Sequence, residues 1–140
     1  MAMARLPVAL AAFCLCWALP WAAARNCSSL AGPFSGCTSL TLFATDLSDG
    51  AAFESLKRAL RGVDGSSITV LQLGSNNLDS SMASQLGELI RQSSSIKVLT
   101  SLANPLGNAG ATALGEALKH NRVLETLTLT GANIGPQGAR

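Results

Sequence analysis

The chain has 140 residues, a length that allows one domain and argues against a multidomain enzyme. Ten lysines and arginines stand against eight aspartates and glutamates, and this near balance gives no reason to expect nucleic acid as a partner. One histidine and no tyrosine leave few groups for acid–base chemistry. We therefore expect a protein that is not an enzyme, with no catalytic residues and no cofactor.

Residues 1–24 have the order of a secretory signal peptide. One basic residue, Arg5, is followed by the apolar run VALAAFCLCWAL, then by Pro20 and three alanines. The run is shorter than the roughly 20 residues that span a bilayer. Cleavage after Ala24 would give a secreted or lumenal protein. Two alternatives stay open: an uncleaved signal that anchors the chain in a membrane, and a mistaken start codon on a cytoplasmic protein.

Two cysteines follow the leader, Cys27 and Cys37. An even pair in a secreted chain predicts one disulfide, whereas a cytoplasmic protein would keep two free thiols. Neither a histidine nor a third cysteine lies near them in the sequence, so we expect no metal site. The tripeptide that begins at Asn26, Asn-Cys-Ser, fits the acceptor pattern for N-glycosylation, which makes Asn26 a candidate site.

From residue 40 onward, short strand patterns alternate with helical patterns. The segment Leu-Thr-Leu-Phe at residues 40–43 precedes an amphipathic stretch over residues 51–61. Further along, the alternating Leu-Gln-Leu at 71–73 and Leu-Thr-Leu at 127–129 predict half-buried strands. Apolar residues three and four apart predict helices over residues 82–91 and 109–120.

A period of 28 residues relates these units. Matching positions at that spacing are Ile68, Ile96 and Leu124; Leu71, Leu99 and Leu127; and Leu78, Leu106 and Ile134. A strand, a loop and a helix of 28 residues cannot bury their apolar sides alone, but stacked copies can.

The frame of these positions resembles that of leucine-rich repeat proteins of the long, ribonuclease-inhibitor-like class. The family pattern L-x-x-L-x-L-x-x-N-x-L is matched in full by Ile68, Leu71, Leu73, Asn76 and Leu78. The resemblance implies an α/β solenoid that is curved, with parallel strands on its concave face and helices on its convex face. It divides the chain into a cysteine-bearing N-terminal cap at 25–39, a degenerate first repeat at 40–67, and repeats at 68–140.

The resemblance also implies that Asn76 and Asn104 lie inside, bonded to backbone groups of the turn that leaves each strand. Two departures weaken the frame: Ser101 replaces a leucine, and Ala132 replaces an asparagine. Either Ser101 points inward and Leu102 outward, or a bulge returns Leu102 to the core. The third unit ends where its helix would begin, so we expect a short or truncated array, or an open end that pairs with another chain.

The resemblance and the lack of a catalytic constellation favour a protein–protein recognition module. The binding surface would be the outward positions of the strands, joined by Leu102 if Ser101 is inward: Val70, Gln72, Gly74, Val98, Thr100, Thr126, Thr128 and Thr130. Threonine at such positions is also explained by strand propensity alone. Alternative functions are a cytoplasmic sensor or scaffold, and the targeting arm of a longer enzyme.

Overall fold

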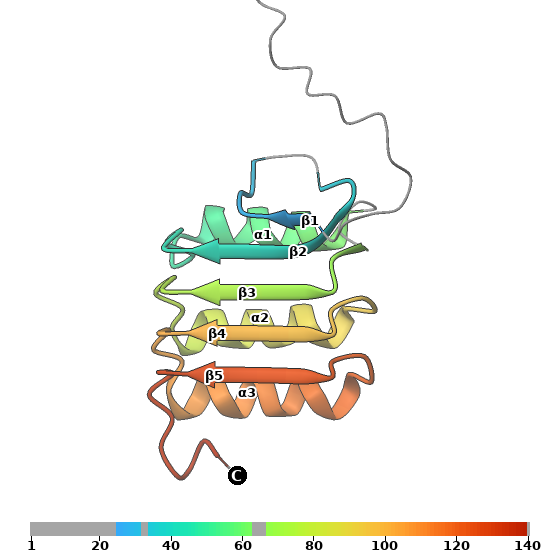
Figure 1. Cartoon of the computed structure of the whole chain (residues 1–140). Coiled ribbons are helices and arrows are strands. Elements are labelled where there is room, and N and C mark those ends of the chain that lie inside the picture. The colour runs from blue at the N-terminus through green and yellow to red at the C-terminus, as the bar shows by residue number, and fades with distance from the viewer. Residues whose placement is uncertain (1–24, 32–33, 63–66, 140) are drawn as a thin grey trace, which may run out of the picture.

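The computed structural model describes residues 25–31, 34–62 and 67–139 (Figure 1). The predicted leader, residues 1–24, lies outside the described residues, as do residues 32–33, residues 63–66 and the last residue. Five parallel strands form one sheet in the order β1-β2-β3-β4-β5. The strands are β1 (Arg25–Cys27), β2 (Cys37–Phe43), β3 (Val70–Gly74), β4 (Val98–Leu102) and β5 (Thr126–Thr130).

In the described part of the chain, three helices alternate with strands β2 to β5: α1 (Gly50–Arg61), α2 (Ser80–Gln92) and α3 (Gly107–His120). Figure 1 looks onto the strands, and all three helices lie behind the sheet, on its other side. The expected α/β class with a parallel sheet is therefore confirmed. Parallel strands need such crossover connections, because a tight hairpin can only join antiparallel neighbours.

The core lies between the sheet and the helices. In the pairing register, Leu71 aligns with Leu99, and Leu99 with Leu127. Leu71 and Leu99 are fully buried, whereas Leu127 lies on the last strand and is half-buried. From the helices, the apolar residues at helical spacing close the other side of the core, led by Phe53, Leu56, Leu86, Ile90 and Leu114.

Two of the helices begin one or two residues earlier than their apolar pattern predicts, because an aspartate caps each of them. The Asp49 side chain accepts a hydrogen bond from the amide of Ala51, and Asp79 accepts from the amides of Ser81 and Met82. Helix α3 has no side-chain cap and begins at Gly107, two residues before the start predicted at residue 109.

Two buried asparagines connect neighbouring strand ends. The Asn76 amide nitrogen donates to the carbonyl of Leu42 at 2.9 Å, and its oxygen accepts from the amide of Thr45 at 2.7 Å. The Asn104 oxygen in turn accepts from the amide of Asn76 at 2.8 Å, and its nitrogen donates to the carbonyl of Leu73 at 2.9 Å. Each carboxamide thus satisfies backbone groups that leave the ladder at the ends of the strands.

The helices are not equally spaced. Helix α2 packs closely against α3, because Gly87 and Gly110 leave room at the contact: a Cβ atom on Gly87 would lie 3.1 Å from the carbonyl oxygen of Ala113. Helix α1 contacts α2 through long polar side chains instead, including a hydrogen bond of 2.8 Å from Arg61 to Gln92. Figure 1 shows the wider separation of α1 and α2.

A disulfide joins Cys27 of β1 to Cys37 at the start of β2, with the Cα atoms 6.0 Å apart. The expected cysteine pair is thus present, and it ties the edge strand to its neighbour. Among residues 25–31, 34–62 and 67–139, no helix is long and apolar enough to cross a membrane.

Candidate binding face

The eight residues predicted to bind a partner lie together on the side of the sheet that carries no helix. We call this side the strand face and define it by three rows that run across the sheet. The first row is Ser39, Val70, Val98 and Thr126; the second is Thr41, Gln72, Thr100 and Thr128; the third is Phe43, Gly74, Leu102 and Thr130. The pairing register aligns the members of each row, so the face is continuous from β2 to β5 (Figure 1).

The strand face carries no charged side chain. The ion pairs between described residues lie elsewhere: three join residues three apart on the helices, and another joins Lys97 to Glu125 at 2.9 Å, just before β4 and β5 begin. A neutral, β-branched surface offers hydroxyl groups and methyl groups but no field that attracts an ionic partner.

Hydrogen bonds order the second row at its β1 end. The Thr41 hydroxyl oxygen lies 2.9 Å from the Asn26 side-chain oxygen and 3.0 Å from the Gln72 side-chain oxygen. One hydroxyl proton serves one of these contacts at a time, and rotation of the Gln72 carboxamide lets its nitrogen donate in the other. The side chains of three adjacent strands are thus linked, and the Gln72 side chain is held in a restrained position.

Two large apolar side chains stand out in the third row. Phe43 is 67% exposed and Leu102 is 39% exposed. The Phe43 ring covers Gly74, where a Cβ atom would lie only 2.4 Å from a ring carbon. An exposed aromatic ring that is held over a glycine is the kind of anchor on which protein interfaces depend, because it contributes a large apolar area at little cost in side-chain entropy.

The sequence led us to miss Phe43 as a surface residue. The pattern Leu-Thr-Leu-Phe placed Phe43 at the end of a strand. Its orientation could have been predicted from the alternation of side chains along a strand: Leu40 and Leu42 are fully buried, so Phe43, one residue after Leu42, points to the opposite side. Ser39 and Thr41 belong to the face by the same alternation. The face is therefore one strand wider than the eight predicted residues.

The exposure of Leu102 follows from the position of Ser101. Ser101 is fully buried, and its hydroxyl oxygen accepts a hydrogen bond of 2.9 Å from the Asn104 side chain. The register of β4 with both neighbouring strands is unbroken. The alternative expectation, a bulge in β4 that returns Leu102 to the core, is therefore wrong. Because the buried Ser101 hydroxyl already has a hydrogen-bond partner, the strand gains nothing by breaking its backbone hydrogen bonds to the neighbouring strands.

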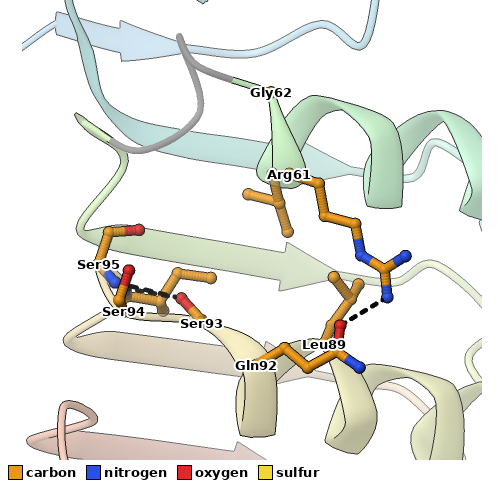
Figure 2. Close-up of a pocket in the computed structure, with 9 residues that line it drawn as sticks. Arg61, Gly62, Leu89, Gln92, Ser93, Ser94 and Ser95 are labelled. Atoms are coloured by element: carbon orange, nitrogen blue, oxygen red, sulfur yellow. Dashed lines mark hydrogen bonds between the residues drawn. The ribbon is translucent and has the colours of Figure 1, made fainter.

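A pocket lies on the helix side of the sheet, where α1 and α2 end (Figure 2). Its volume is about 370 Å³, and its lining combines apolar Leu60, Leu89 and Ile96 with Arg61, Gln92 and the serines at 93–95. Figure 2 shows Arg61 reaching across the opening to Gln92, while Ser93 accepts a hydrogen bond from the amide of Ser95. The serine hydroxyl is thus engaged in its own turn, and the pocket reflects the wide spacing of α1 and α2.

Titratable groups with shifted pKa values lie away from the strand face. The Arg91 guanidinium donates two hydrogen bonds to Glu88 on α2 and lowers the pKa of that carboxyl, while Glu88 raises the pKa of Arg91. Hydrogen bonds from Ser48 and Asn77 lower the pKa of Asp46 in the turn after β2. Both carboxyls are exposed and keep their charge, as solvated structural groups do.

In the part of the chain that the structure describes, no three His, Cys, Asp or Glu side chains come together in a way that would hold a metal ion. His120 stands at the last residue of α3, where a cation complements the helix dipole. The strand face is therefore the surface that we consider as the candidate functional site.

Neither the protein-family models nor the curated proteins contain a match to this chain.

Proposed function

We propose that the chain is a leucine-rich repeat recognition module of the secretory pathway, which binds a protein partner through the strand face and has no catalytic activity of its own. The 28-residue frame supports the repeat assignment, since residues one period apart are direct neighbours in the sheet: Val70 pairs with Val98, and Val98 with Thr126. The curved solenoid, with the strands concave and the helices convex, belongs to this proposal.

The secretory location is supported by two observations. The signal-like order of residues 1–24 directs a chain to the secretory pathway. The disulfide between Cys27 and Cys37 is compatible with an oxidising, extracellular environment. A membrane-anchored form would arise if the leader stays attached.

The single observation that carries the binding proposal is the exposed Phe43 ring, fixed over Gly74 on an otherwise neutral face. Because the described sheet has only five short strands, the face contributes about 800 Å² at most, which is the lower end of a specific interface. We therefore expect weak binding by this chain alone.

Site-directed photo-crosslinking in the culture medium of secreting cells tests the proposal. A photoreactive residue at Thr100 samples the centre of the strand face, and one at Thr112 on α3 samples the helix side as a control. We expect a discrete adduct from position 100 that is lost when Gln72 and Thr128 are both replaced by Glu. Adducts of equal yield from both positions, or adducts that survive the double replacement, would exclude the strand face as the binding surface.

A further inference from the structure

Asn26 lies on β1, next to the β2 edge of the strand face. It aligns with Ser39 in the pairing of β1 with β2, and its side-chain oxygen accepts a hydrogen bond of 2.9 Å from the Thr41 hydroxyl. The residue is exposed. The contact uses the carboxamide oxygen, whereas the carboxamide nitrogen, to which an N-glycan would be attached, makes no hydrogen bond within the described residues.

The same residue begins the only acceptor tripeptide that follows the leader, Asn26-Cys27-Ser28. We propose that Asn26 carries an N-linked glycan that stands over the β1 end of the strand face and confines a partner to the β4–β5 end. This inference rests on the proposed secretory location and on the strand face as the binding surface.

The modification is a group transfer from a lipid-diphosphate-linked oligosaccharide, which the secretory pathway supplies. The Asn26 carboxamide nitrogen forms a bond to the anomeric carbon of the first sugar. The bond from that carbon to the diphosphate breaks, the lipid diphosphate leaves with the electron pair, and one amide proton passes to a base.

The geometry of the sheet limits the reach of the glycan. Neighbouring strands lie about 4.8 Å apart, so β3 is about 10 Å from β1, and β5 is about 19 Å from it. Gln72 on β3 therefore lies beneath the sugar chain, whereas Thr128 in the same row lies near the far edge. The glycan is also attached to β1, which is an edge strand of the sheet formed by the described residues.

The first measurement is the mass of the full chain secreted from cultured animal cells, before and after treatment with a peptide amidase that removes N-glycans. We expect a glycan mass that disappears on treatment, together with conversion of Asn26 to Asp. Ser28→Ala is the matched control, because it destroys the acceptor pattern while it keeps Asn26 and its hydrogen bond to Thr41. An unmodified Asn26 in the secreted protein would overturn the inference, and would leave the proposed binding function untouched.

The second measurement tests shielding without any knowledge of the partner. Gln72→Cys and Thr128→Cys are each produced with Ser28 intact and with Ser28→Ala, and the rate of labelling by a polymer-linked maleimide is compared after mass analysis confirms the Cys27–Cys37 disulfide. We expect the glycan to slow labelling several-fold at position 72 and to leave position 128 unchanged. Equal labelling rates at position 72 with and without the glycan would overturn the proposal that the glycan confines a partner to the β4–β5 end. Equal slowing of labelling at positions 72 and 128 would overturn it too.

Discussion

The buried Asn104 side chain is the most heavily used polar group in the core, and its removal gives the sharpest test of the fold. Its oxygen accepts from the backbone amides of Asn76 and Leu78, at 2.8 and 3.3 Å. Its nitrogen donates to the carbonyl of Leu73 at 2.9 Å. Asn104→Ala leaves at least two buried backbone donors without an acceptor, and each costs about 1–3 kcal/mol. We expect a loss of about 2–6 kcal/mol in the free energy of unfolding, a large part of the roughly 5–15 kcal/mol of an ordinary domain.

Two further variants give a graded series, and they keep the prediction testable if Asn104→Ala does not fold. Asn76→Ala removes the acceptor of a single, part-buried amide, that of Thr45, and should cost about 1–3 kcal/mol. Asn108→Ala makes the same chemical change in an exposed residue of α3, whose partner amide at Gly135 is open to water, and should cost no more than about 1 kcal/mol.

Urea unfolding followed by circular dichroism measures all three variants, and an unchanged dependence on urea concentration shows that the same surface is exposed. The expected order of destabilisation is Asn104 first, then Asn76, then Asn108. If Asn104→Ala were no less stable than Asn108→Ala, the hydrogen-bonded asparagines would contribute nothing specific to the fold, and the reasoning would be refuted.

Three other outcomes follow from the same contacts. Gly115→Ala should raise the unfolding free energy by up to about 1 kcal/mol, because alanine favours the helix and nothing lies within 4 Å of the new Cβ atom; Gly87→Ala should gain less or lose stability, because a backbone carbonyl oxygen lies 3.1 Å away. Reducing the disulfide, which joins residues 10 apart in sequence, should lower stability by about 2–3 kcal/mol in the same urea assay. Arg91 lowers the pKa of Glu88 in the folded state, so the ion pair stabilises the fold at neutral pH, and this stabilisation is lost as the pH falls through the lowered pKa. In thermal melts over this acidic range, Glu88→Gln should therefore lose less stability with falling pH than the unaltered protein does.

Periodicity in the sequence predicted strands β2 to β5, the helices between them and their alternation, but it did not predict β1, which lies in the segment expected to be a cysteine-bearing cap. A spacing of 28 residues places Leu71, Leu99 and Leu127 at equivalent points of successive strands, and side chains at equivalent points of a parallel sheet are neighbours. The helix starts were less predictable from apolar spacing alone. The caps at Asp49 and Asp79 were readable signals that extend two helices toward the N-terminus.

The orientation of single residues in β4 was not fixed by the pattern. A serine at a core position costs a buried hydroxyl, and a bulge costs ladder hydrogen bonds, so both outcomes were open. The outcome depends on Asn104, which lies three residues after Ser101 and bonds its hydroxyl. This contact needs a positioned carboxamide, and no count of apolar spacing reveals it.

The width of the strand face was underestimated for a related reason. The eight predicted residues came from the units with the clearest frame, whereas Phe43 belongs to the degenerate first unit. In the sheet, β2 pairs with β3 as regularly as β3 pairs with β4, and Phe43 aligns directly with Gly74. The close approach of the ring explains the glycine at that position, since any Cβ atom there would collide with it.

The helix layer shows how one position in each unit controls spacing. Strands in a sheet lie about 4.8 Å apart, whereas packed helices need about 8–10 Å, so helices that alternate with strands must spread apart on their own side of the sheet. Gly87 keeps this spread small between α2 and α3, because it lets the backbone of α3 approach. Lys57 stands at the corresponding point of α1 and extends toward Gln85 of α2, at 3.4 Å. A lysine in place of a glycine holds these two helices apart, and the pocket lined by Arg61 and Gln92 is the consequence, so its presence alone is no sign of a ligand.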